Sequence, residues 1–365
     1  MRIAILGSRG IPARYGGFET FAERLSLGLA AKGHEVSVFC EASDGASTAG
    51  GEQIFQSVRL RYVSAPRLGL LHTILYDLFS LWQARSGYDV VYMLGYGAAG
   101  FCWIPRLWGT EVWINPDGLE WARAKWGFLA RAYFRWMEWT SIHVANRIIA
   151  DAQAIADRLS EHHSPLRHCS VIPYGCEVPS NRPDPDMLRE WDLTSGGYYA
   201  VICRLEPENH VQEIADAFLK SGSSRKLVIV GDHLSKNAYV RALSAINDPH
   251  VQMVGTVFDQ QKLTALRSYA FGYFHGHSVG GTNPSLLEAM ACGNLIFAHD
   301  NPFNRETLSG SGLLFRDPNH LSDLIRGAEA GLLDADALRV QAQTRARTRY
   351  SWTEIINEYA KLLDR

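Results

Sequence analysis

The sequence predicts an α/β protein made of two doubly wound domains, each a parallel sheet with helices on both faces. Short apolar, β-branched runs alternate with longer helical patterns along most of the 365 residues. Continuous apolar runs are typical of buried parallel strands, and their alternation with helices indicates doubly wound sheets. The alternation is interrupted once, between Pro173 and Gly197, and a chain of this length is expected to hold about two domains.

The expected strands are short and spread over both halves of the chain. In the first half they are Arg2–Gly7, Glu35–Cys40, Val58–Val63, Asp89–Leu94, Glu111–Asn115, Arg147–Ala150 and Ser170–Ile172. In the second half they are Tyr199–Cys203, Lys226–Val230, Val251–Val254, Gly272–His275, Leu295–Ala298 and Leu313–Phe315. The proline-rich, polar stretch Val178–Pro185 predicts a linker. We therefore expect a first domain at 1–175, a linker at 176–197, a second domain at 198–348 and a C-terminal helix at 349–365.

Composition indicates a globular protein and excludes several other classes. Hydrophobic residues make up 47% and charged residues 20% of the chain, which excludes a disordered or collagen-like polymer. The formal net charge is −2, so no global positive field favours nucleic acid as a partner. The six cysteines form no C-x-x-C pair, so we identify no zinc or redox motif and expect a reducing, cytoplasmic setting. We expect no transmembrane helix, because glycines and polar residues interrupt the longest uncharged run, at 90–105.

A glycine-rich turn follows the first expected strand, with the sequence GSRGIPARYGGFET at residues 7–20. Glycines let the backbone approach a phosphate or sugar closely, and the following helix offers N–H groups and the positive end of its dipole. Arg9 and Arg14 lie in this loop and favour an anion site over a glycine turn without a ligand. The pattern is not G-x-G-x-x-G, which argues against a nicotinamide-dependent dehydrogenase.

A second glycine turn, HGHSVGGTNPSLLEAM at residues 275–290, lies in the other expected domain. A strand runs into Gly280 and Gly281, followed by a Thr-Asn cap and a proline at the first helical position. Glu288 lies on the first turns of this helix, where its carboxylate could accept hydrogen bonds from ribose hydroxyls. The alternative is an ordinary solvated glutamate. We interpret His275 and His277 as hydrogen-bonding groups rather than a metal pair.

Two further strand ends carry charged residues. Arg204 ends a strand of the second domain and could bind a pyrophosphate through two hydrogen bonds, whereas the alternative is an ion pair with Glu206 or Glu208. Asp117 and Glu120 follow a strand of the first domain, and either could position or deprotonate an acceptor hydroxyl. The alternative for Asp117 is a simple Asp-Gly turn.

An aromatic stretch, Trp126–Trp139, interleaves three tryptophans, two phenylalanines and a tyrosine with Arg131 and Arg135. Tryptophans beside basic residues are typical of a membrane interface. The same pattern fits an amphipathic helix packed on a core, and both interpretations stay open.

Taken together and in order, these motifs resemble bacterial rhamnosyltransferases of retaining glycosyltransferase family four. The resemblance is carried by the loop at 7–20, NPDGLEW at 115–121, RLEPEN at 204–209 and GGTNPSLLEA at 280–289, and it covers nearly the whole chain. It implies a GT-B fold, in which two Rossmann-like domains face each other across a cleft that holds a nucleotide sugar. The first domain would be the acceptor side, the second would bind the nucleotide sugar, and the last helix would return to the first domain.

The resemblance also implies roles for individual residues. The catalytic set would be Arg204, which binds the pyrophosphate, Glu288, which holds the ribose, and Asp117, which lies near the acceptor or the reacting sugar. The implied donor-binding residues are Gly16, Gly17, Arg9, Arg14, His277, Gly280, Gly281, Thr282 and Asn283. Those on the acceptor side are Glu120 and Trp121. No metal ion is implied, and no cofactor beyond the nucleotide-diphosphate sugar that serves as substrate.

Three positions depart from the family pattern. Gly280 stands eight residues before Glu288, where the wider superfamily has a second glutamate. Ser278 follows the loop histidine, where many close relatives have a glutamate. Asn209 stands near the place of the usual lysine partner of Arg204. We expect Arg9 or Arg14 to supply the missing positive charge.

These observations predict a retaining, metal-independent glycosyltransferase of bacterial surface polysaccharide synthesis. We expect it to move a sugar, L-rhamnose from dTDP-rhamnose, onto a lipid-linked or oligosaccharide acceptor. A lipid-linked acceptor would place the protein in the cytoplasm, with peripheral contact at the cytoplasmic face of the membrane. The alternatives are a transferase that uses UDP-GlcNAc or GDP-mannose, a GT-B nucleotide-sugar epimerase, and a non-catalytic nucleotide-sugar-binding subunit, which the missing glutamate and lysine would suit.

Overall fold

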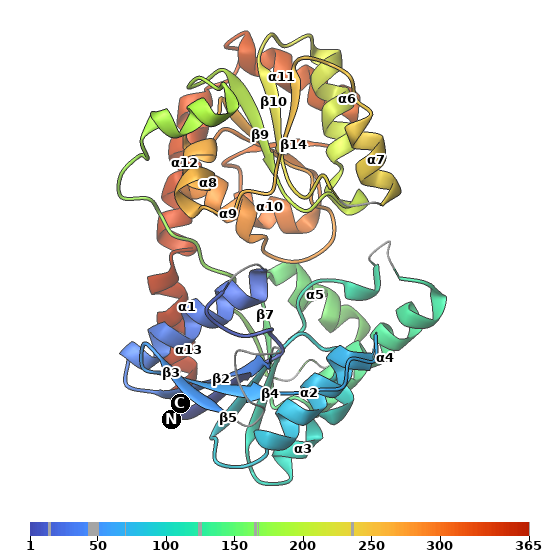
Figure 1. The fold of residues 1–365 in the computed structure, drawn as a ribbon, viewed down its shortest axis with the longest axis vertical. Helices are drawn as coiled ribbons and strands as arrows, with labels where there is room; N and C mark the ends of the chain where they lie inside the picture. Colours follow the sequence, from blue (N-terminus) through green and yellow to red (C-terminus); the bar gives the residue numbers. More distant parts are fainter. Residues whose placement is uncertain are drawn as a thin grey trace. The chain divides into compact units, whose positions relative to one another are not determined.

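The protein forms two compact units in the computed structural model (Figure 1). The structure describes residues 1–13, 16–42, 51–69, 71–122, 126–163, 166, 168–234 and 237–364. Unit 1 consists of Met1–Tyr174 together with Trp352–Arg365, and unit 2 consists of Gly175–Ser351. Each unit is a sheet flanked by helices, which confirms the predicted α/β class.

Unit 1 contains an eight-stranded sheet in the order β3-β4-β2-β1-β5-β6-β7-β8. All neighbouring strands are parallel except β3, which pairs antiparallel with β4. The strands are β1 (Arg2–Leu6), β2 (Glu35–Glu41), β3 (Glu52–Phe55), β4 (Val58–Val63), β5 (Val90–Leu94), β6 (Glu111–Asn115), β7 (Arg147–Ala150) and β8 (Cys169–Val171). Each predicted strand of this half is present, with ends that differ from the prediction by at most one residue. Strand β3 was not predicted from the sequence, because this edge strand is polar and its one large aliphatic side chain, Ile54, is 77% exposed.

Helices from both ends of the chain complete unit 1. They are α1 (Gly17–Ala31), α2 (Leu71–Gln83), α3 (Trp103–Arg106), α4 (Phe128–Val144), α5 (Gln153–His162) and α13 (Trp352–Leu363), with 3₁₀ turns η1 (Ala99–Phe101) and η2 (Glu120–Ala122). The C-terminal helix α13 lies beside α1 (Figure 1). Tyr359 of α13 forms a buried hydrogen bond with Tyr92 of β5, at 2.8 Å between the hydroxyls, and its ring contacts Phe21 of α1. The last helix therefore completes the core of the first unit.

Unit 2 contains a six-stranded, wholly parallel sheet in the order β11-β10-β9-β12-β13-β14. The strands are β9 (Tyr198–Ile202), β10 (Lys226–Val230), β11 (Val251–Gly255), β12 (Gly272–His275), β13 (Ile296–His299) and β14 (Leu313–Phe315). The helices are α6 (Val211–Ser221), α7 (Ala238–Ser244), α8 (Gln260–Ser268), α9 (Pro284–Ala291), α10 (Pro302–Leu308), α11 (Pro318–Glu329) and α12 (Ala335–Arg349), with 3₁₀ turns η3 (Pro185–Trp191) and η4 (Pro207–Asn209). The predicted strands again match within one residue at each end.

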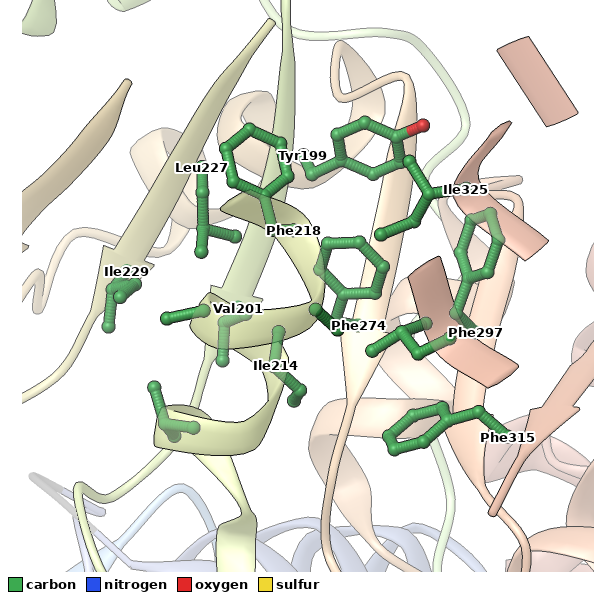
Figure 2. Close-up of a cluster of buried hydrophobic side chains, with 14 of the residues drawn as sticks. Tyr199, Val201, Ile214, Phe218, Leu227, Ile229, Phe274, Phe297, Phe315 and Ile325 are labelled. Atoms are coloured by element: carbon green, nitrogen blue, oxygen red, sulfur yellow. The ribbon is translucent and has the colours of Figure 1, made fainter. Parts of the chain in front are cut away.

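Aromatic side chains fill one face of this sheet (Figure 2). Tyr199 of β9 stacks on Phe274 of β12 with ring centroids 4.9 Å apart, and Phe218 of α6 meets the edge of Tyr199. Ile325 of α11 joins the same buried cluster. Burial of such large side chains is the main favourable term in the folding of the unit.

Much of the segment that we expected to be a linker packs on unit 2. Within 176–197, the turn η3 buries Leu188 and Trp191. The hydroxyl of Tyr269 donates a hydrogen bond of 2.5 Å to the Pro183 carbonyl. Prolines and polar residues here therefore fold back on the sheet edge instead of forming an extended spacer.

A buried carboxyl group lies in α2 of unit 1. Asp77 is 6% exposed, and burial raises its pKa to about 7, although the charge of Arg9 opposes this shift. Because the folded state keeps the Asp77 proton to a higher pH than the unfolded chain does, ionisation costs stability as the pH rises from about 4 to about 7.

We expect Asp77→Asn to remove this pH dependence. Between pH 5 and pH 8, wild type should lose roughly 3 kcal/mol of unfolding free energy relative to the variant. Urea unfolding at the two pH values measures the difference. Asp192→Asn, on an exposed turn of unit 2, is the control, and its unfolding free energy should change with pH as that of wild type does. An Asp77→Asn protein with an unchanged slope would contradict the interpretation.

Candidate nucleotide-sugar site

The strand order of unit 2 reverses between β9 and β12. Numbered within the unit, the order is three-two-one-four-five-six, the arrangement of dinucleotide-binding doubly wound sheets, in which ligands bind beyond the carboxyl ends of the strands at the reversal. Arg204 follows β9, and the loop from His277 to Asn283 follows β12. The structure therefore brings these sequence-predicted residues to the two sides of one switch point.

Asn209 ties the two loops together. This buried side chain donates a hydrogen bond of 2.7 Å to the Arg204 carbonyl, and its Oδ1 lies 2.7 Å from Nδ1 of His277. The backbone N–H of Ser278 donates to the Glu208 carbonyl at 3.0 Å. At a position where the family resemblance suggests a lysine, this chain thus has a neutral side chain that fixes loop geometry and adds no charge.

Arg204 presents a half-exposed guanidinium. Its side chain is 46% exposed, and Nη1 lies 3.8 Å from Oε1 of Glu206. An exposed ion pair of this length contributes about 0–1 kcal/mol. The pair that we considered as an alternative therefore exists, but it is weak enough for the guanidinium to turn to a diphosphate.

The second glycine turn leads into the N-terminus of α9. Gly280 has φ of +129°, a conformation that disfavours other residues, while Gly281 and Thr282 are buried. The Asn283 side chain caps the helix by accepting from the Ser285 N–H at 2.9 Å. The cap occupies the Asn283 side-chain oxygen, and direct contact of Gly280, Gly281, Thr282 or Asn283 with a donor stays a prediction.

Glu288 is paired rather than simply solvated. Its side chain is 38% exposed, and Oε2 lies 2.6 Å from Nη2 of Arg267, a side chain that is only 4% exposed. Arg267 lies on α8, and no sequence motif indicates it as a partner of Glu288.

Four histidines gather around the same strand ends. His210 stacks on His299 with ring centroids 4.6 Å apart, and its Nε2 lies 3.1 Å from Oγ of Ser278. Burial lowers the pKa of His275 well below its ordinary value, with His277 and His299 adding to the shift. Among the residues that the structure describes, no three His, Cys, Asp or Glu side chains converge so as to hold a metal ion.

In unit 1, the described parts of the glycine turn, residues 7–13 and 16–20, follow β1 at that sheet's own switch point, between β1 and β5. Gly7 has φ of +87°, and a Cβ there would collide with the Leu94 carbonyl oxygen. Gly16 has φ of +121°, and Oε1 of Glu19 accepts from the Arg9 N–H at 3.0 Å. The backbone conformation therefore favours glycine at both positions, whatever the loop binds.

The guanidinium of Arg9 already has partners within unit 1. Nη1 donates to Glu41 at 2.6 Å and Nη2 to Thr73 at 3.0 Å. A carboxylate thus shares the charge that we expected Arg9 to give to a phosphate. Arg14, the other expected arginine, lies outside the described residues, and a contact of Gly16 or Gly17 with a donor stays a prediction.

Asp117 is a turn residue that lies near a second carboxylate. Its φ is +52°, and its N–H donates to Oδ1 of Asn115 at 2.7 Å. The buried Asp151 follows β7. Burial raises the pKa of Tyr174, and the negative charges of Asp117 and Asp151 raise it further. Asp151 was not predicted from the sequence, although an aspartate that directly follows a buried strand is a recognisable signal.

Glu120 and Trp121 take part in a local network. The Trp126 indole donates to Glu120 at 2.9 Å, and the Trp121 indole donates to the buried Glu138 at 3.0 Å. Arg135 lies over the Trp121 ring at 4.5 Å. These contacts give both residues a structural role, and contact with an acceptor stays a prediction.

Helix α4 has a packed face and an exposed aromatic stripe. Met137, Glu138 and Ser141 are buried, whereas Leu129, Trp136 and Trp139 are 81%, 60% and 48% exposed. Exposed aromatic and leucine side chains also lie at Trp103 of α3 and at Leu107 and Trp108, which follow that helix. None of the helices within the described ranges combines the length and hydropathy that a bilayer crossing requires.

Comparison with known families and structures agrees with this arrangement. Residues 1–177 match a domain of unknown function (DUF1972), and residues 194–349 match glycosyl transferases group 1. No curated protein matches.

Solved structures with the same fold are distant in sequence. Sucrose-phosphate synthase from Thermosynechococcus elongatus aligns with a TM-score of 0.83 at 19% identity, over 100% of this chain and 98% of that one. Anabaena HepE in complex with UDP aligns with a TM-score of 0.77 at 15% identity, over 100% of both chains. An Escherichia coli structure titled as trehalose-6-phosphate with UDP-2-fluoro glucose aligns with a TM-score of 0.76 at 11% identity, over 100% and 99%. The chain thus has the GT-B fold of two Rossmann-like domains, and its residues 194–349 match glycosyl transferases group 1.

Proposed function

We propose that the protein is a retaining glycosyltransferase that moves L-rhamnose from dTDP-rhamnose to a lipid-linked or oligosaccharide acceptor in bacterial surface polysaccharide synthesis. The observation that carries the proposal is the placement of Arg204 and the Gly280–Glu288 segment on the two sides of the β9–β12 switch point. This placement lies in a glycosyltransferase group 1 domain. One structural neighbour, Anabaena HepE, was solved in complex with UDP-glucose, which supports a nucleotide sugar as donor.

In this proposal unit 2 binds the donor. Arg204 pairs with the diphosphate, because a guanidinium matches the geometry of phosphate oxygens. Backbone N–H groups at the start of α9 and the positive end of its dipole favour the same negative charge. The carboxylate of Glu288 accepts a hydrogen bond from the free 3′-hydroxyl of the donor's deoxyribose.

The reaction exchanges one glycosidic bond for another. The bond between the anomeric carbon and the donor phosphate oxygen breaks, while the acceptor oxygen bonds to that carbon on the same face. The acceptor proton passes to the departing phosphate oxygen, so the products are a nucleoside diphosphate and the extended glycan. Charge develops on the leaving diphosphate, where Arg204 and the backbone donors stabilise it without a metal ion.

Unit 1 supplies the acceptor side. Asp117 and Asp151 give two carboxylates at the carboxyl ends of β6 and β7, a chemistry suited to sugar hydroxyls. The exposed aromatic stripe of α4 lies beside exposed Arg131 and Arg135, whereas the acid of that helix, Glu138, is buried. Tryptophans with basic residues suit the surface of an anionic membrane, where a lipid-linked acceptor would be found.

We expect dTDP to raise the melting temperature of the protein more than UDP or GDP, because a ligand that binds only the folded state stabilises it. With dTDP-rhamnose and an undecaprenyl-diphosphate-linked sugar, wild type should form a product whose anomeric configuration, read by NMR, equals that of the donor. Arg204→Ala should lower the rate by about 10²–10³-fold, the usual cost of one charge-stabilising donor.

The matched control is Arg189→Ala, an arginine of unit 2 that is 79% exposed and pairs with Asp186, three residues earlier. It should keep the wild-type rate. Donor incubated alone should stay unchanged, since formation of an epimer would instead identify an epimerase. Donor binding without turnover on any lipid-linked acceptor would identify a non-catalytic subunit, and a stronger response to UDP-GlcNAc or GDP-mannose would overturn the donor assignment.

We further expect the α4 stripe to bind anionic membranes. The double variant Trp136→Ser, Trp139→Ser should lower binding to phosphatidylglycerol vesicles by at least about tenfold, because it removes two indole rings that would be transferred from water into the membrane interface. Flotation with phosphatidylglycerol and phosphatidylcholine vesicles measures the effect.

The control for this experiment is Leu332→Ser, a residue of unit 2 that is 79% exposed. It should bind vesicles as wild type does. Equal flotation of the tryptophan variant and wild type, or flotation that does not depend on lipid charge, would contradict membrane contact through α4.

A further inference from the structure

A buried arginine stands behind the carboxylate that we assign to the ribose. Arg267 lies in the last turn of α8, and its side chain is 4% exposed. Its Nη2 lies 2.6 Å from Oε2 of Glu288, and within the described residues its Nε has no hydrogen-bond partner. The guanidinium therefore directs its main polar contact to a single oxygen.

The surrounding strands and helices hold this guanidinium in place. The carbonyl of Arg267 accepts from the Asn294 side chain at 2.7 Å. Ser285, whose Oγ lies 3.5 Å from Nη2, is itself fixed by Tyr273 at 2.6 Å and by the Ile202 carbonyl at 2.7 Å. The contacts run from β9 and β12 to α9, the elements that border the switch point.

Burial alone would disfavour this charge. Burial opposes ionisation of Arg267, but Glu288, Tyr273 and Cys292 together outweigh it and raise the arginine pKa above its ordinary value. Glu288 is the more exposed partner, at 38%. Within the described residues its second oxygen, Oε1, takes no hydrogen bond, so that oxygen can accept one from a ligand.

We propose that Arg267 is a positioning residue that holds the Glu288 carboxylate in one orientation for a pentose hydroxyl of the donor. A carboxylate that Arg267 already holds in one orientation binds a ligand hydroxyl more tightly, because the glutamate side chain then loses less conformational freedom on binding. This inference rests on the proposed function, since it names the group that prepares the same site.

The test compares nucleotides that differ only in the ribose. Calorimetry measures the affinity of dTDP against 3′-deoxy-dTDP and of UDP against 2′,3′-dideoxy-UDP. For the nucleotide that binds, wild type should prefer the hydroxylated form by at least about tenfold, as expected for hydrogen bonds to a charged group. Arg267→Met should reduce this preference below about threefold while changing the affinity for the deoxy form less than about twofold.

Two further variants separate positioning from a structural role. Arg267→Lys keeps a positive charge behind Glu288 and should restore an intermediate preference. Arg225→Lys alters another arginine of unit 2, which pairs with Glu329 at 3.0 Å before β10, and should keep the full wild-type preference.

Each outcome decides one question. A folded Arg267→Met protein that keeps the hydroxyl preference overturns the positioning role, and so does an equal loss of affinity for both forms. A wild type that binds neither dTDP nor UDP overturns the proposed function instead. A wild type that binds nucleotide without any hydroxyl preference overturns the role of Glu288 and, with it, this inference.

Discussion

The order of the parallel strands determines where the loops of this chain can form a ligand-binding site. When all strands of a sheet run the same way, every strand ends at the same edge, and the reversal of order leaves one position there that no crossover connection covers. Unit 2 has its reversal between β9 and β12, and unit 1 has its own between β1 and β5. Arg204 and the two glycine turns lie at these positions because the topology leaves no other place for loops that follow those strands.

The loops at these edges are shaped by their own polar side chains. Asn209 joins the Arg204 loop to the His277 loop, and Glu19 accepts from the backbone of the turn after β1. Such hydrogen bonds fix loop conformation before any ligand arrives, which lowers the entropy lost on binding. They also show why glycine patterns alone are weak evidence for a ligand. A Cβ at Gly7 would collide with the Leu94 carbonyl whether or not a ligand binds.

Prediction from the sequence succeeded where the signal is local. Runs of apolar residues located the predicted strands to within one residue, and Arg204 and Glu288 could be found because each follows a recognisable strand or glycine turn. The polar edge strand β3 has no such run. Arg267 and Asp77 were missed for a different reason, since their importance comes from a partner on another element or from burial, and neither spacing nor composition encodes a contact between α8 and α9. Asn209 was noted only as a missing lysine, because its hydrogen bonds between two loops leave no sign in the sequence.

The ion pair between Arg267 and Glu288 is asymmetric, and this decides how changes at the site must be interpreted. Removing the exposed partner leaves a buried guanidinium unpaired, a change that typically costs about 3–5 kcal/mol. Removing the buried partner leaves a carboxylate that water can solvate, because Glu288 is 38% exposed. Loss of activity in a Glu288 variant therefore combines lost ligand contacts with lost stability. Arg204 is 46% exposed and lies 3.8 Å from Glu206. Its substitution therefore leaves no buried charge unpaired, and a loss of activity in that variant is easier to assign to lost ligand contacts.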